Sequence, residues 1–154
     1  MFNIIISIIR YLLFAVYFFA LGTITFISFF ILPIDIAYKL VKPFCRGSLF
    51  VLGAKTKIKG KFPVSGHYIV MMHHSSFIDS FIFPLVVSGK FTGIADMKNF
   101  NYPVYAQILR RMRVVSIDRS NRIQAIRGIK QGENILKEGY HLGILPEGTR
   151  TIDG

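Results

Sequence analysis

The chain has 154 residues, a formal net charge of +11 and 52% hydrophobic residues. This length accommodates one domain with a hydrophobic core and excludes a second full domain. The apolar content excludes a disordered chain, and a basic, apolar composition points to a membrane or a polyanion as partner. The single cysteine, Cys45, excludes an internal disulfide framework and a cysteine-rich zinc module, and we expect it to be a small buried residue.

An uncharged segment of 24 residues, from Tyr11 to Ile34, dominates the N-terminal part of the sequence. As a helix it would be about 36 Å long, and the hydrocarbon core of a bilayer is about 30 Å thick. We therefore expect a membrane-spanning helix. Gly22, Thr23 and Pro33 leave open a hairpin of two shorter helices in one leaflet, and a buried helix of a soluble protein is the remaining alternative.

Charged residues are concentrated after this segment. Before Lys39 the sequence has one basic residue, Arg10, and one acidic residue, Asp35. The positive-inside rule then places the part after the segment on the cytoplasmic side, where its cations also attract anionic lipid headgroups. We accordingly predict a membrane-anchoring segment over residues 1–38 and a basic body over residues 39–154.

Strands and helices alternate along the body, which predicts an α/β layered domain with a largely parallel sheet. Asn121 is expected to cap the last predicted helix, and Gly139 follows its end. The predicted elements are an edge strand over 54–61, strands over 68–72, 91–95, 114–117 and 141–145, and helices over 77–87, 102–112 and 121–137.

Polar residues follow the predicted strand 68–72 in the run His73-His74-Ser75-Ser76-Phe77-Ile78-Asp79. Open α/β sheets bind their ligands at the carboxyl ends of the strands. If Ser75 or Ser76 caps a helix here, Asp79 can reach one imidazole nitrogen and leave the other free to accept a proton. The pattern alone also fits helix capping and a polar surface. A metal site is not expected, because adjacent histidines project in different directions.

Three further polar segments, over residues 96–103, 116–120 and 145–150, each follow a predicted strand. All three are therefore expected to meet at one edge of the sheet. Arg119 and Arg150 have planar guanidinium groups suited to a phosphate, and Gly148 lets backbone amides approach an anion closely. A surface ion pair of Arg119 with Asp118 or Glu147 is the alternative.

Together, the three motifs His74-x-x-x-x-Asp79, Ile117-Asp118-Arg119 and Pro146-Glu147-Gly148-Thr149-Arg150 resemble, in this order behind a hydrophobic arm, those of the glycerolipid acyltransferases. The 1-acyl-sn-glycerol-3-phosphate acyltransferase type is the most similar. The resemblance implies that residues 39–154 are the N-terminal portion of an acyltransferase domain and that the C-terminal part of that domain is missing. It also implies the following roles: His74 as general base, Asp79 as its orienting partner, Arg119, Glu147, Gly148, Thr149 and Arg150 as phosphate-binding residues, and Lys98 as a contact to the acceptor or the oxyanion.

The activity implied by the resemblance is transfer of a fatty acyl group from acyl-CoA or acyl-carrier protein to the 2-hydroxyl of lysophosphatidate. The product is phosphatidate, an intermediate of phospholipid synthesis, and neither a cofactor nor a nucleic acid is implied. The alternatives are an acyltransferase that uses glycerol 3-phosphate or another lysophospholipid, and a non-catalytic membrane-anchored module that binds anionic lipid. The sequence departs from the family pattern at His73, Leu145 and Arg113, where asparagine, phenylalanine and a nearby glycine are common.

Overall fold

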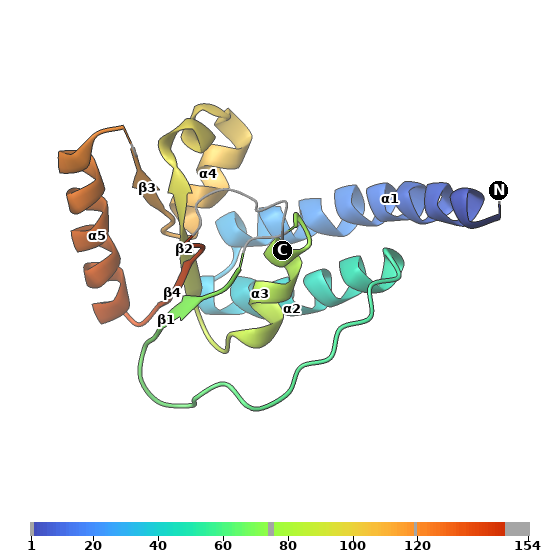
Figure 1. Cartoon of the computed structure of the whole chain (residues 1–154), viewed down its shortest axis with the longest axis horizontal. Helices are drawn as coiled ribbons and strands as arrows, with labels where there is room; N and C mark the ends of the chain where they lie inside the picture. The colour runs from blue at the N-terminus through green and yellow to red at the C-terminus, as the bar shows by residue number, and fades with distance from the viewer. Residues whose placement is uncertain (1, 74–75, 119, 147–154) are drawn as a thin grey trace. The chain divides into compact units, whose positions relative to one another are not determined.

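The computed structural model describes residues 2–73, 76–118 and 120–146 (Figure 1). It divides the chain into two compact units. The helical unit comprises Met1–Lys61 and Phe77–Val86, and the sheet unit comprises Phe62–Ser76 and Val87–Gly154. Each unit is described by itself below.

The helical unit contains α1 (Phe2–Ile31), α2 (Ile34–Val51) and α3 (Asp79–Val86). The chain reverses at Pro33, so α1 and α2 lie antiparallel (Figure 1). Proline is suited to this position because it has no backbone N–H to donate and a fixed φ that starts the next helix. The sequence predicted no helix over α2.

The first helix is long and apolar enough to cross a membrane over Ile4–Ile31, and its most apolar window is entirely unburied. It is the one helix of this kind in the part of the chain that the structure describes. It continues without a break through Gly22 and Thr23, and of the three positions on which the hairpin alternative rests only Pro33 ends a helix and turns the chain back. The expected apolar helix of membrane-spanning length is therefore present.

Aromatic rings hold α1 against α2. Tyr17 stacks on Phe44 with the ring centroids 6.0 Å apart, and Phe29 meets Tyr38 edge-on at 5.3 Å. Cys45 lies in the same interface, 3% exposed, which confirms its expected burial. The buried residues of α2 recur at helical spacing, which gives this helix one apolar face and explains its packing on α1; they are Ala37, Tyr38, Val41, Cys45, Ser48 and Leu49.

The sheet unit contains four strands in the order β1-β4-β2-β3, and every neighbouring pair is parallel. This confirms the predicted α/β class. The strands are β1 (Ile69–Met71), β2 (Phe91–Asp96), β3 (Val115–Ile117) and β4 (His141–Ile144), and the helices are the 3-10 helix η1 (Met97–Asn101), α4 (Pro103–Arg111) and α5 (Arg122–Lys137).

The strand predicted over 54–61 is wrong, because the structure has no strand there. Alternation of lysine with other residues gives a strand one wet face, but a strand also needs an apolar face to bury. The residues between the lysines are Thr56, Ile58 and Gly60, and Ile58 is 51% exposed. With so little to bury, the segment is extended and solvated.

Helix α5 packs on one face of the sheet (Figure 1). Two glycines, Gly128 and Gly132, are buried on its inner side and allow the close approach to β3 and β4. Asn121 caps the helix through Oδ1, which accepts from the backbone N–H groups of Ile123 and Gln124 at 3.1 and 3.2 Å. Gly139 follows the end of the helix at φ +91°, so both predicted ends of this helix are confirmed.

Candidate active site

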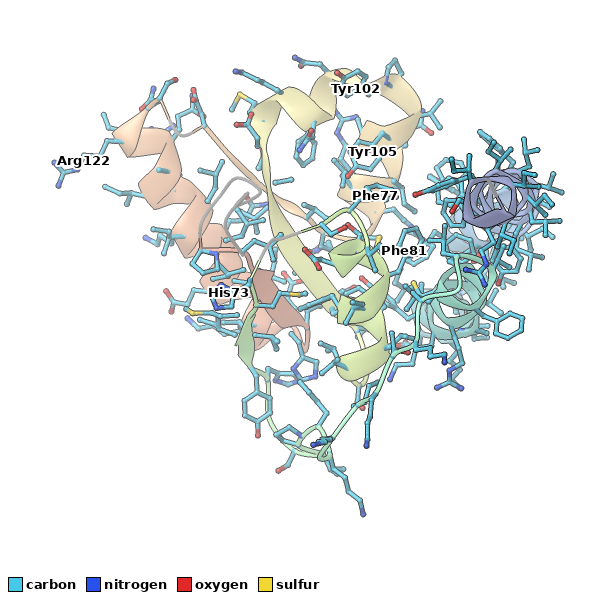
Figure 2. The ribbon with its side chains drawn as sticks, turned by 45° about the vertical axis from the view of Figure 1, so that its right-hand side comes forward. His73, Phe77, Phe81, Tyr102, Tyr105 and Arg122 are labelled. Atoms are coloured by element: carbon cyan, nitrogen blue, oxygen red, sulfur yellow. The ribbon has the colours of Figure 1, made fainter. Side chains whose placement is uncertain are left out.

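Asp79 begins α3 and is 8% exposed. A carboxylate in the first turn of a helix is favoured by the helix dipole. The turn of Phe77 and Ile78 precedes the helix, so α3 starts later than a cap at Ser75 or Ser76 would place it. Phe77 also contacts Phe81 one turn further on, with the ring centroids 5.5 Å apart (Figure 2). Asp79 is thus held at a fixed point of the helical unit.

The strand that leads to the histidine motif ends at Met71. The next residue, Met72, still donates its N–H to the carbonyl of Ile144 at 3.3 Å, and the chain leaves the sheet at His73. His73 is exposed (Figure 2). His74, the predicted base, lies outside the described residues.

After β2, Asp96 turns the chain into η1. Its Oδ1 accepts from the backbone N–H of Lys98 at 2.9 Å. The main chain around Lys98 is therefore fixed by the residue that ends the strand, while the lysine side chain is exposed. Lys98 thus stands where the sequence predicts it, directly beyond the carboxyl end of a strand.

After β3, Asp118 closes a turn on Ser120. Its Oδ1 accepts from the backbone N–H of Ser120 at 2.9 Å and from the Ser120 hydroxyl at 2.6 Å. These hydrogen bonds, together with the positive charge of Lys98, hold the pKa of Asp118 below its ordinary value. The structure therefore brings two of the predicted segments together, since Lys98 follows β2 and Asp118 follows β3.

The turn at Asp118 delivers the chain to the start of α5. The first turn of α5 has no acidic residue, and Arg122 stands at its exposed beginning, directed away from the sheet (Figure 2). Two N–H groups of this helix end, those of Ile123 and Gln124, are already paired with the Asn121 cap. Lys98 and Arg122 place two cations at the carboxyl edge of the sheet unit, where the carboxylates of Asp96 and Asp118 also lie.

The remaining predicted residues fall mostly outside the described part. The structure describes Leu145 and Pro146 after β4, so the last motif begins at the same edge as Lys98 and Asp118. From the sequence, Asp118 is considered only as a motif residue and as an ion-pair partner of Arg119, although an aspartate two residues before a serine is a common turn signal. The predicted site residues that lie outside the described part are His74, Arg119, Glu147, Gly148, Thr149 and Arg150.

Arg113 shows how the chain accommodates its departure from the family glycine. Its φ is +61°, in the left-handed region that glycine adopts without strain. The side chain forms an ion pair with Glu138, which follows the end of α5. The turn into β3 is therefore made with a strained residue whose side chain gains a partner.

Polar segments follow the parallel strands at one edge of this α/β sheet, which is where such sheets bind their ligands. Residues 54–154 match the Acyltransferase family, and the chain belongs to that family.

Several relatives of the chain share one name. The chain is 30% identical over 107 residues to the 1-acyl-sn-glycerol-3-phosphate acyltransferase of Limnanthes douglasii, which covers 69% of this chain and 38% of the relative. It is 28% identical to the Pseudomonas aeruginosa protein of the same name, over 94% of this chain and 58% of the relative. The chain thus spans less than two thirds of the length of these relatives.

The fold is also that of a solved structure. The crystal structure of the 1-acyl-sn-glycerophosphate (LPA) acyltransferase PlsC from Thermotoga maritima matches with a TM-score of 0.71 at 22% identity. The match covers 97% of this chain and 62% of the other. At this identity the likeness shows the fold, which agrees with the predicted class.

Proposed function

We propose that the chain transfers a fatty acyl group from acyl-CoA or acyl-carrier protein to the 2-hydroxyl of lysophosphatidate and so makes phosphatidate. The observation that carries this proposal is the order of polar turns at the strand ends. The histidine motif follows β1, Lys98 follows β2, Asp118 follows β3 and Pro146 follows β4, in a chain of the acyltransferase family. The names of the relatives supply the acceptor and the reaction.

The proposed reaction needs one base and an activated donor. His74 takes the proton of the acceptor hydroxyl as its oxygen attacks the thioester carbonyl carbon. The tetrahedral intermediate collapses, the carbon–sulfur bond breaks, and the departing thiolate takes the proton back from the His74 imidazolium. Asp79 orients the imidazole and stabilises its charged form, as a buried carboxylate can.

The proposed reaction also needs residues that bind the phosphate of the acceptor. We assign this role to Arg119 and to the loop of Glu147, Gly148, Thr149 and Arg150, with Lys98 as a further cation at the same edge. The exposed cation of Lys98, close beyond the carboxyl end of β2, supports this assignment. The apolar α1 would hold the protein at the bilayer that contains the acceptor, with the body on the cytoplasmic side as the distribution of basic residues favours.

The test uses membranes that contain the full chain, a labelled acyl donor and lysophosphatidate. His74→Ala should lower kcat by roughly 10²–10⁴-fold, the range for removal of a positioned base. Asp79→Asn should lose a comparable factor, and the two losses should not add, because the residues act as one unit. His73→Asn is the matched control and should be nearly silent.

Two outcomes would contradict this assignment. Loss of activity in His73→Asn with retention in His74→Ala would show that the register of the motif is wrong. Binding of lysophosphatidate without phosphatidate formation, unaffected by His74→Ala, would favour the non-catalytic lipid-binding module. Competition by glycerol 3-phosphate or by lysophospholipids with larger headgroups identifies the preferred acceptor.

A further inference from the structure

His141 joins three segments of the sheet unit at the edge opposite to the polar turns. It is the first residue of β4, and its side chain is 6% exposed. Its Nδ1 accepts a hydrogen bond from the backbone N–H of Tyr68 at 3.2 Å, directly before β1. The backbone N–H of His141 donates to the carbonyl of Lys90, directly before β2, at 2.9 Å. One residue therefore links the amino ends of β1, β2 and β4.

These hydrogen bonds require one protonation state of the ring. Because Nδ1 accepts from an N–H group, it carries no proton, and the neutral tautomer has its proton on Nε2. Nε2 lies beside Gly89, and the ring is hydrogen-bonded to the backbone of Ser88. A protonated imidazole has two donors and no acceptor, so the Tyr68 N–H would face another N–H and lose its partner.

Aromatic rings enclose the imidazole. Tyr68 stacks on it with the centroids 5.8 Å apart and 9° between the planes, and Phe62 meets it edge-on at 4.9 Å. The titratable groups that face it are His67 and Tyr68 on the incoming segment, with the His67 centroid 5.8 Å away. Lys90, before β2, contacts His141 through its backbone carbonyl, and its ammonium group lies over the Tyr140 ring. Burial first, and then the charge of His67, lower the pKa of His141, against a smaller opposite effect of Ser88.

The first strand needs such a contact to keep its register. It has three residues, and its outer ones, Ile69 and Met71, are 51% and 66% exposed. The pairing register of such a strand is weakly specified, because a shift of the strand by one residue would lose few apolar contacts. Beside the Nδ1 hydrogen bond, the N–H of Leu142 donates to the carbonyl of Tyr68 at 2.9 Å. The position of Tyr68 thus sets the pairing of β1 with β4.

We propose that His141 is a positioning residue whose neutral imidazole clasps the segment Phe62–Tyr68 and the start of β1 to β4, and whose protonation releases them. The strands β1 and β4 are paired as Val70 with Gly143, and they lead to the histidine motif and to Pro146. Release at their amino ends therefore loosens the strand pairing that leads the chain to these two motifs, which contain the proposed base and part of the proposed phosphate site. This consequence for catalysis rests on the proposed function, whereas the clasp itself does not.

Amide hydrogen exchange of the Tyr68 N–H in the full chain, corrected for the intrinsic rate, tests the clasp between pH 7.5 and 4.5. In the wild-type chain the protection should fall by up to tenfold per pH unit below the pKa of the folded His141. Amides inside α5 serve as the control and should keep their protection. His141→Asn should stay protected throughout, because an Asn Oδ1 at the Nδ1 position accepts the same hydrogen bond and does not titrate. His141→Phe should lose protection at every pH.

His67→Gln tests the effect of the neighbouring charge, because without that charge His141 binds a proton at higher pH. The loss of protection should therefore begin at a higher pH than in the wild-type chain. A pH-independent Tyr68 amide in the wild-type chain, or a His67→Gln transition that does not move upward, would overturn the proposal. The same holds if His141→Asn follows the wild-type pH dependence. If exchange behaves as expected and no acyl transfer is found, the proposed function fails and the clasp stands.

Discussion

Replacement of Gly128 by alanine tests the packing of α5 on β3. A Cβ atom at this position would stand 2.7 Å from Cγ1 of Ile117 and 3.3 Å from the carbonyl oxygen of Ser116. The first atom is fixed by a β-branched side chain and the second belongs to the main chain, so neither moves easily. Alanine gains about 1 kcal/mol of helix propensity over glycine, while overpacking costs about 1–3 kcal/mol. We expect Gly128→Ala to lower the free energy of unfolding by up to about 2 kcal/mol.

Gly132 is the matched control on the same face, one turn further along. A Cβ atom there would meet Cδ2 of Leu142 at 3.0 Å, and this methyl group lies at the end of a flexible side chain. The propensity gain is the same, and the overpacking is smaller. Gly132→Ala should therefore be neutral or more stable than wild type by up to about 1 kcal/mol.

The measurement is thermal and denaturant unfolding of both variants of the full chain in detergent. A difference of about 1 kcal/mol corresponds to roughly 2–4 °C in Tm for a chain of this size. In a double-mutant cycle with Ile117→Ala, Gly128→Ala should destabilise the chain much less, because Cγ1 of Ile117, the atom nearest the new Cβ, is absent. A Gly128→Ala chain as stable as Gly132→Ala would refute the packing argument.

The remaining predictions concern the same unit and the same unfolding assay. Thr92→Val should raise stability by about 1 kcal/mol, because the buried Thr92 hydroxyl has no hydrogen-bond partner among the described residues and valine has the same shape; a loss of stability would show that the hydroxyl is satisfied. Asn121→Ala should lower the free energy of unfolding by about 1 kcal/mol, because it removes the cap of α5, whereas Asn121→Asp should keep most of the stabilisation that the cap provides. Arg113→Gly should be more stable than Arg113→Ala by about 1 kcal/mol, because both lose the ion pair with Glu138 and only glycine relaxes the positive φ; equal stabilities would contradict this.

The elements of the sheet unit could be predicted because their signals are local. The period of apolar residues, the Asn121 cap and Gly139 define α5 within its own sequence, and the structure has it over Arg122–Lys137. The parallel sheet follows from the alternation of strands with helices, since such crossovers bring strands side by side in the same direction.

The elements that were missed depend on partners far along the chain. Helix α2 has an apolar face at helical spacing in its own sequence, but the partner of that face, α1, is shown only by the aromatic contacts of Tyr38 and Phe44. The segment over 54–61 has the alternation of a strand but no partner strand to pair with. Local pattern therefore indicates which segments can form a strand, and tertiary contacts decide which of them do.

The same distinction applies to the histidines. His74 stands in the motif His74-x-x-x-x-Asp79, so the sequence indicates a chemical role for it. His141 stands alone at a strand end, and the sequence gives no sign that its Nδ1 accepts from a residue 73 positions earlier. A buried imidazole that accepts a hydrogen bond loses that bond when it is protonated. An imidazole that serves as a general base loses its ability to take a proton in the same way. From the two proposals together we expect the activity to fall at low pH through both histidines, and His141→Asn, which cannot titrate, should leave the contribution of His74 alone.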